Sequence, residues 1–98
     1  MTDLGDLDDP YHGVHPAVPQ AGYERLTWQK PDPRCDRVRV RDHTCECQHI
    51  VYELCQAGGL HFIRRLYRSD CVVEHQSDWL RAPEAERLWL RILLGQAR

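Results

Sequence analysis

The 98-residue chain contains no long apolar run, and its longest uninterrupted apolar stretches span only a few residues. A membrane-spanning helix needs about 20 consecutive apolar residues. A secretory signal peptide needs a basic segment followed by an apolar one of about 7–15 residues. Neither pattern is present, so we expect no membrane segment and a cytoplasmic location.

Lysine is almost missing, because twelve of the thirteen basic residues are arginine, and alanine, glycine and proline are used freely. This bias is typical of GC-rich coding sequences, so we expect a bacterial source. The net charge of -2 combines -4 over residues 1–33, which carry six acids against Arg25 and Lys30, with +2 over the remainder. So mild an excess argues against a general polyanion-binding protein.

A disulfide framework is also not expected. The five cysteines (Cys35, Cys45, Cys47, Cys55 and Cys71) are an odd number. In the cytosol thiols are normally kept reduced. The sequence therefore predicts free thiols.

Residues 1–33 hold five of the six prolines and three of the six glycines, and no apolar period is sustained there. We predict an acidic tail over 1–33, disordered or loosely packed, and a small domain over 34–98. Tyr23, Leu26 and Trp28 are the only apolar anchors in the tail. They are expected to pack back onto the domain or to bind a partner.

The pattern over 34–98 predicts a small α+β domain with a short antiparallel sheet, in the order strand, helix, hairpin, helix. Alternation predicts a strand over residues 35–42. Spacings of three and four predict a helix from Thr44 to Gly58-Gly59. The apolar runs 60–68 and 71–76 predict a hairpin. Pro83, followed by an apolar stripe that ends before Gly95, predicts the last helix.

A two-residue turn at Ser69 and Asp70 sets the expected hairpin register. It pairs Arg68 with Cys71, Leu66 with Val73, and Arg65 with Glu74. The expected core face holds Phe62, Leu66, Cys71 and Val73.

The stretch HTCECQH, residues 43–49, has the residue types of a metal site. On a strand His43 and His49 would lie about 20 Å apart. On a helix the pairs His43/Cys47 and Cys45/His49 would point about 200° apart. We therefore predict no metal and no cofactor, with one alternative left open, a partial site in which Cys35 or His43 assists Cys45 and Cys47.

On the predicted helix Cys47 and Cys55 face the core with Cys71, whereas Cys45 faces outward beside His49. An exposed thiol near a helix N-terminus has a physical reason for a lowered pKa, so Cys45 with His49 forms a possible reactive thiol. A core of 65 residues has little room for an oxyanion site and a substrate pocket. We expect no enzyme, and a redox-sensing role is the more plausible use of the thiol.

Arginines line one side of the first predicted strand: Arg34, Arg37, Arg39 and Arg41. With the hairpin arginines they would form an anion-binding or nucleic-acid-binding surface. The alternative is a solvated strand face balanced by nearby acids (Asp36, Asp42, Glu53 and Glu74). The interleaved acids favour the solvated face.

Four apolar residues are more than a small core is expected to cover: Trp79, Leu80, Leu90 and Leu94. Large apolar residues gathered in one patch are typical of contact sites. The sequence therefore predicts a non-enzymatic protein-interaction or regulatory module that binds a protein partner or forms a homodimer through its C-terminal helix. The first alternative is a thiol- or metal-based sensor centred on Cys45 and Cys47. The second is nucleic-acid binding through the arginine-lined strand.

Overall fold

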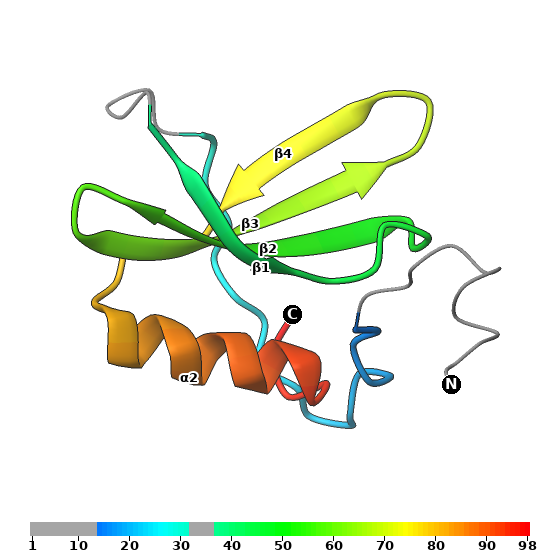
Figure 1. Cartoon of the computed structure of the whole chain (residues 1–98). Coiled ribbons are helices and arrows are strands. Elements are labelled where there is room, and N and C mark those ends of the chain that lie inside the picture. The colour runs from blue at the N-terminus through cyan, green and yellow to red at the C-terminus, as the bar shows by residue number, and fades with distance from the viewer. Residues whose placement is uncertain (1–13, 32–36) are drawn as a thin grey trace, which may run out of the picture.

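A computed structural model describes residues 14–31 and 37–98 of the chain (Figure 1). The described residues form one four-stranded antiparallel sheet and one helix. The elements are β1 (Arg39–His43), β2 (Ile50–Ala57), β3 (Leu60–Arg68), β4 (Val72–Gln76) and α2 (Ala82–Leu93). The strands lie in sequence order across the sheet, each paired with the next. The predicted α+β class is confirmed.

The helix predicted over residues 44–57 is wrong, because this stretch forms a loop and then β2. Both faces of β2 are buried. Tyr52 and Leu54 belong to the cluster under the helix, while Cys55 belongs to a second cluster on the other face. A strand buried on both sides lacks the alternation that identifies strands in sequence. Its apolar residues here happened to fall at helical spacing.

Gly58 and Gly59 turn the chain between β2 and β3 instead of ending a helix. Their φ angles are 57° and 82°, and Ala57 pairs directly with Leu60. Two central residues with positive φ are the requirement of a tight two-residue hairpin turn that matches the strand twist, and glycine meets it without steric cost.

The hairpin of β3 and β4 is confirmed, but its predicted register is wrong by one residue. Arg68 pairs with Val72 and Leu66 with Glu74, which leaves three loop residues, Ser69 to Cys71. The Ser69 N–H donates to the Cys71 carbonyl at 3.2 Å. A slip of one residue moves every side chain to the opposite face. Cys71 and Val73 are therefore exposed, not part of the core.

The predicted C-terminal helix is confirmed as α2, which packs across one face of the sheet (Figure 1). Its buried side chains Ala85, Leu88, Trp89 and Ile92 meet Tyr52, Leu54 and Ile63 of the strands. Beyond the helix, Gly95 has φ 76°. The Gly95 N–H donates to Ile92 O at 3.1 Å and the Gln96 N–H to Arg91 O at 2.8 Å. These two bonds form the Schellman ending that glycine favours.

A smaller apolar cluster lies on the opposite face of the sheet. Cys55, Ala57 and Phe62 are buried there, with Val38 and Trp79 packed against them. The Trp79 ring stacks on Phe62 with centroids 4.9 Å apart and planes 13° apart. Trp79 is therefore packed against the protein's own apolar cluster.

Residues 14–31 run along the helix end and the sheet and bond to them. The Ala17 N–H donates to Leu93 O at 2.9 Å, and the Gln20 N–H to Gly95 O at 2.8 Å. Leu26 and Trp28 pack against the main core. Trp28 also lies under the Arg65 guanidinium, 4.4 Å from its ring centroid. The boundary predicted at residue 33 lies outside the described residues.

The described part of the chain contains no helix long and apolar enough to cross a bilayer.

Candidate metal centre

The loop between β1 and β2 starts from Thr44, which is fully buried. The Thr44 N–H donates to Tyr52 O at 2.8 Å, and the Tyr52 N–H donates to Thr44 Oγ1 at 2.9 Å. A buried side chain bonded in this way fixes where the ladder ends. The next residue, Cys45, is only 3% exposed, so its thiol is held inside the protein.

A segment distant in sequence lies beside this loop. Val14 forms a parallel bridge with Thr44, and the Cys45 N–H donates to Val14 O at 2.9 Å. These contacts place His15, the next residue, against the loop. Thirty positions separate His15 from Cys45, so the backbone pairing alone brings them together.

Three potential metal ligands meet at this point. Cys45 Sγ lies 3.1 Å from Cys47 Sγ, and Cys47 Sγ lies 3.4 Å from His15 Nε2. The ligand atoms of all three residues lie within 4.8 Å of one another. Cys45 is buried whereas Cys47 and His15 are exposed, so the group is open to solvent on one side.

The spacing is close to that of a tetrahedral zinc site. Zinc binds cysteine sulfur at about 2.3 Å and histidine nitrogen at about 2.0–2.1 Å. Tetrahedral angles then place two sulfurs about 3.8 Å apart and a sulfur about 3.5 Å from a nitrogen. The Cys47 to His15 separation fits directly. The two sulfurs, now 3.1 Å apart, would have to separate by about 0.7 Å.

A neighbouring amide is placed to orient the imidazole. Gln48 Nε2 lies 3.5 Å from His15 Nδ1 and 3.5 Å from Cys47 Sγ. A histidine that ligates a metal through Nε2 normally donates its Nδ1–H to a second group, which fixes the ring. The Gln48 side-chain carbonyl can accept that bond after rotation of the amide.

The part of the loop that approaches β2 is hydrogen-bonded to β3. Arg68 Nη1 donates to Glu46 O at 3.0 Å, and the Arg68 N–H donates to His49 O at 2.7 Å. His49 Nδ1 lies 3.3 Å from Arg68 O, and His43 Nδ1 lies 2.9 Å from Thr44 O. Neither histidine belongs to the ligand group found among the described residues.

The predicted thiol exposures are partly reversed. Cys45, predicted to face outward, is buried, whereas Cys47 and Cys71, predicted to be buried, are exposed. The three errors have a common kind of cause, a wrong local structure. Cys45 and Cys47 lie in a loop instead of a helix, and Cys71 lies in a longer turn than predicted. Cys55 is buried as expected. Cys35 lies outside the described residues.

Cys55 differs chemically from the loop thiols. It is fully buried on β2, and burial raises the pKa of its thiol to about 12. At neutral pH such a thiol is almost entirely protonated and therefore unreactive.

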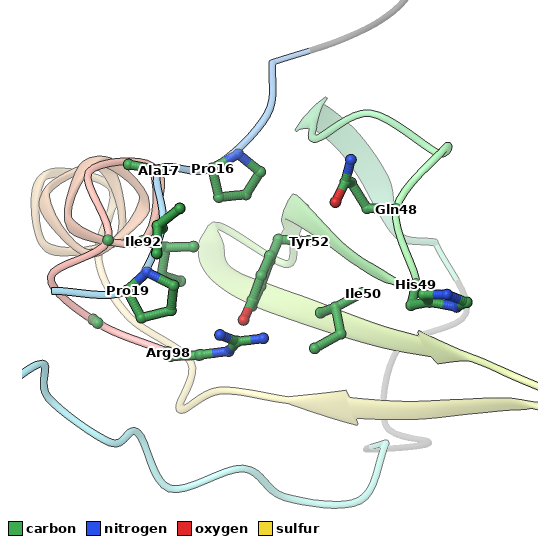
Figure 2. Close-up of a pocket in the computed structure, with 12 residues that line it drawn as sticks. Pro16, Ala17, Pro19, Gln48, His49, Ile50, Tyr52, Ile92 and Arg98 are labelled. Carbon is green, nitrogen blue, oxygen red and sulfur yellow. The ribbon is translucent and has the colours of Figure 1, made fainter.

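A cavity of about 350 Å³ (Figure 2) is lined by Pro16 and Gln48, the sequence neighbours of His15 and Cys47. Its walls come from the residues that follow His15 and Cys47 and from the helix end; they include Pro16, Pro19, Gln48, His49, Ile92 and Arg98. Tyr52 lines the interior. Burial raises the pKa of the Tyr52 phenol, and the positive charges of Arg98 and Arg65 offset part of that rise.

The residues predicted to bind anions gather elsewhere. Arg37, Arg39 and Arg41 line one shallow pocket beside the β2–β3 turn. Arg34 lies outside the described residues.

The predicted partner surface is divided. Trp79 stacks on Phe62, and Leu80 is half-buried and packs against the main core. Leu90 is 55% exposed and Leu94 is 44% exposed. Of the four residues predicted to bind a partner, Leu90 and Leu94 are therefore the two that the structure leaves exposed.

Sequence reasoning missed His15. It stands alone in a segment interpreted as tail, and no spacing rule connects it to Cys45 and Cys47. Comparison of the chain with protein-family models, curated proteins and solved structures finds no match.

Proposed function

We propose that this protein is a non-enzymatic regulatory module that binds one soft divalent metal ion, Zn²⁺ above all, through His15, Cys45 and Cys47. The observation that carries the proposal is the convergence of these three ligand atoms within 4.8 Å of one another. Two of them come from a single loop, and the third comes from a segment thirty residues earlier.

The ligand types determine the class of ion. Thiolates and imidazole suit zinc and other soft or borderline metals, whereas calcium and magnesium require several oxygen ligands. A C-x-C pair with a distant histidine supplies two sulfurs and one nitrogen. Three protein ligands leave a fourth position for water or for a further ligand.

This open position supports a sensing role instead of a purely structural one. Cys47 and His15 are exposed, so the ion can exchange with solvent. Metal binding would also fix His15 and thereby the cavity wall that follows it, Pro16 to Pro19. Zinc ligation needs reduced thiols, so we place the function in a reducing compartment, the bacterial cytoplasm.

Cobalt substitution tests the proposal. Co²⁺ added to the metal-free protein is expected to bind one ion per chain and to produce the near-ultraviolet absorption of thiolate coordination. Cys45→Ser and Cys47→Ser should each lower affinity by more than about 100-fold, since loss of a direct ligand exceeds the effect of losing an outer-shell partner. His15→Ala should shift the visible cobalt bands as a nitrogen ligand is lost.

Cys71→Ser is the matched control, because Cys71 is exposed in a different loop. It should leave both the spectrum and the affinity unchanged. A cobalt spectrum without thiolate absorption, or one that survives the double change Cys45→Ser/Cys47→Ser, would refute the metal site.

A second candidate function is self-association through the end of α2. Leu90 and Leu94 lie one helical turn apart, where side chains share a face, and both are substantially exposed. An exposed apolar pair is best covered by another apolar surface, and a second copy of this chain supplies the same pair across a two-fold axis.

Equilibrium sedimentation of the double variant Leu90→Glu/Leu94→Glu tests self-association. The variant should shift the population toward monomer, whereas Val72→Glu, a change at a 61% exposed residue of β4, should not. A wild-type protein that is monomeric at all accessible concentrations would exclude the dimer.

A further inference from the structure

A shallow pocket of about 300 Å³ lies at the end of the sheet opposite the thiol loop. It is lined by Arg37, Arg39, Arg41, Gln56, Ala57, Gly58 and Gly59. Figure 1 shows the β2–β3 turn at one end of the sheet and the β1–β2 loop at the other. Three arginines therefore line one shallow hollow beside the turn.

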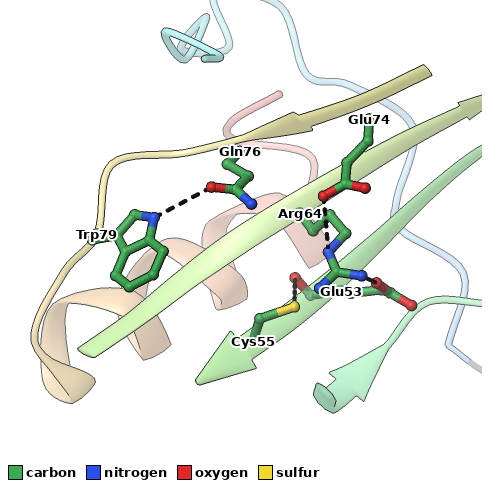
Figure 3. Close-up of polar contacts among 6 residues, drawn as sticks. All are labelled: Glu53, Cys55, Arg64, Glu74, Gln76 and Trp79. Carbon is green, nitrogen blue, oxygen red and sulfur yellow. Dashed lines mark hydrogen bonds and ion pairs between the residues drawn. The ribbon is translucent and has the colours of Figure 1, made fainter. Parts of the chain in front are cut away.

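Three of the four acids expected to balance these arginines have other partners, and the fourth, Asp36, lies outside the described residues. Glu53 and Glu74 flank Arg64, at 3.3 and 3.5 Å (Figure 3). Asp42 accepts hydrogen bonds from the Trp89 Nε1–H at 3.3 Å and from the His43 N–H at 2.8 Å.

Two of the three arginines, Arg39 and Arg41, keep their positive charge without an acidic partner in the described structure. Within residues 14–31 and 37–98, no ion pair involves Arg39 or Arg41, and the described lining residues include no acid. Like charges held near one another raise the local potential and favour an anion between them.

Backbone geometry explains how the arginines converge. Arg39 pairs with Gln56, and Val40 with Cys55, but the register then shifts so that Asp42 pairs with Leu54. Arg41 is the extra residue of this bulge. Strand alternation already places Arg39 and Arg41 on one side of the strand. The bulge bends the strand at Arg41, and both residues line the same pocket.

The adjoining turn keeps the pocket open. A Cβ atom placed on Gly58 or Gly59 would meet nothing within 4 Å, so the space above the turn is unoccupied. Because neither residue has a side chain, a ligand can approach the backbone closely there.

We propose that this arginine pocket binds the phosphate groups of a small, multiply charged ligand. Guanidinium forks bind phosphate oxygens in pairs, with charge-assisted hydrogen bonds. The volume is at the lower end for small-molecule sites. The described lining contains no aromatic ring on which a base could stack, so recognition rests on phosphate and not on a base.

Calorimetric titration with inorganic pyrophosphate in low-salt, metal-free buffer tests the site. The wild-type protein should bind the probe, and Arg39→Gln/Arg41→Gln should lose about tenfold or more in affinity. Both residues are exposed, so the variant should fold. Arg39→Lys/Arg41→Lys keeps the charge but loses the paired geometry, so its affinity should lie between the two.

Arg81→Gln/Arg87→Gln is the matched control, since it removes two exposed arginines outside this pocket and changes net charge equally. It should leave binding unchanged. Equal losses in both double variants would reduce the effect to overall charge and overturn the site, as would absence of pyrophosphate binding by the wild type.

Titration with a single-stranded oligonucleotide tests the remaining alternative, which is nucleic-acid binding. If it binds tightly with a salt dependence that indicates more phosphate contacts than three arginines supply, and pyrophosphate does not compete, the ligand is a nucleic acid and the small-ligand proposal fails. The assay uses no metal, so its outcome is independent of the thiol site.

Discussion

The two ends of β2 carry opposite chemistries. At the Ile50 end, thiols and an imidazole gather around a partly buried point, as suits a soft cation. At the Ala57 end, arginines surround an open pocket, as suits a hard anion. The strand separates them by roughly 23 Å at about 3.3 Å per residue.

The two ends are also assembled differently. The arginine pocket comes from the alternation of one strand and the tight turn beside it, which are local features. The thiol site depends on Val14 pairing with Thr44 across thirty residues. Long-range backbone pairing is therefore required for the cation site and not for the anion site. A change that disturbs this pairing far from both sites should affect the cation site alone.

The largest contrast is expected among the thiols themselves. At neutral pH the thiolate fraction of Cys55, with a pKa of about 12, is about 3,000-fold below that of an ordinary thiol near 8.5. Alkylation of native protein followed by peptide mass spectrometry should modify Cys47 and Cys71 rapidly and leave Cys55 intact. Saturating Zn²⁺ should protect Cys47 but not Cys71.

Oxidation of the Cys71→Ser variant with hydrogen peroxide is a second test of whether the metal protects the loop thiols. Cys45 and Cys47 should each lose one hydrogen and form a disulfide, while hydrogen peroxide is reduced to two molecules of water. Bound Zn²⁺ should slow this reaction. In the wild-type protein, labelling of Cys55 as fast as Cys71, or failure of Zn²⁺ to protect Cys47, would contradict these predictions.

A smaller effect is expected from Gly95→Ala at the helix end. Gly95 has φ 76°, and an added Cβ would collide with the Val18 carbonyl oxygen. Left-handed strain and displacement of residues 17–18 should together cost about 1–3 kcal/mol of unfolding free energy. Because this segment also carries His15, cobalt affinity should fall, while pyrophosphate affinity should not.

Gly22→Ala is the control for Gly95→Ala. Gly22 has φ 77°, but a Cβ there would meet nothing within 4 Å. It should lower stability by strain alone, as chemical denaturation would report, and leave cobalt affinity unchanged. Equal cobalt affinities in both glycine variants and the wild type would show that the segment does not position His15.

Local patterns predicted much of the fold. The α2 helix, the hairpin and an arginine-bearing strand were all visible as periodicity or turn chemistry. The β2 strand was not, because residues such as Tyr52 and Cys55 are buried on opposite faces, and burial on both sides removes alternation. The β3–β4 register failed because a three-residue loop and a two-residue turn share the same polar residues.

The two candidate sites differ in the same way, because one rests on a local pattern and the other on a contact between distant segments. Arg37, Arg39 and Arg41 were grouped from sequence because strand spacing alone places them together. The sequence also indicates the Cys45 and Cys47 pair as a partial metal site, but it offers Cys35 or His43 as the assisting ligand. His15 joins through a backbone bridge between distant segments, and no periodic signal in a single sequence encodes such a bridge.

Residues 24–26 also lie parallel to residues 96–98. The Glu24 N–H donates to Gln96 O at 2.9 Å, the Arg98 N–H to Glu24 O at 2.9 Å, and the Leu26 N–H to Arg98 O at 3.0 Å. Tension applied between the two chain ends would pull these parallel segments past each other lengthwise. All three bonds would then bear the force simultaneously, in shear, instead of opening one after another, which gives the described domain a mechanical clamp at its periphery.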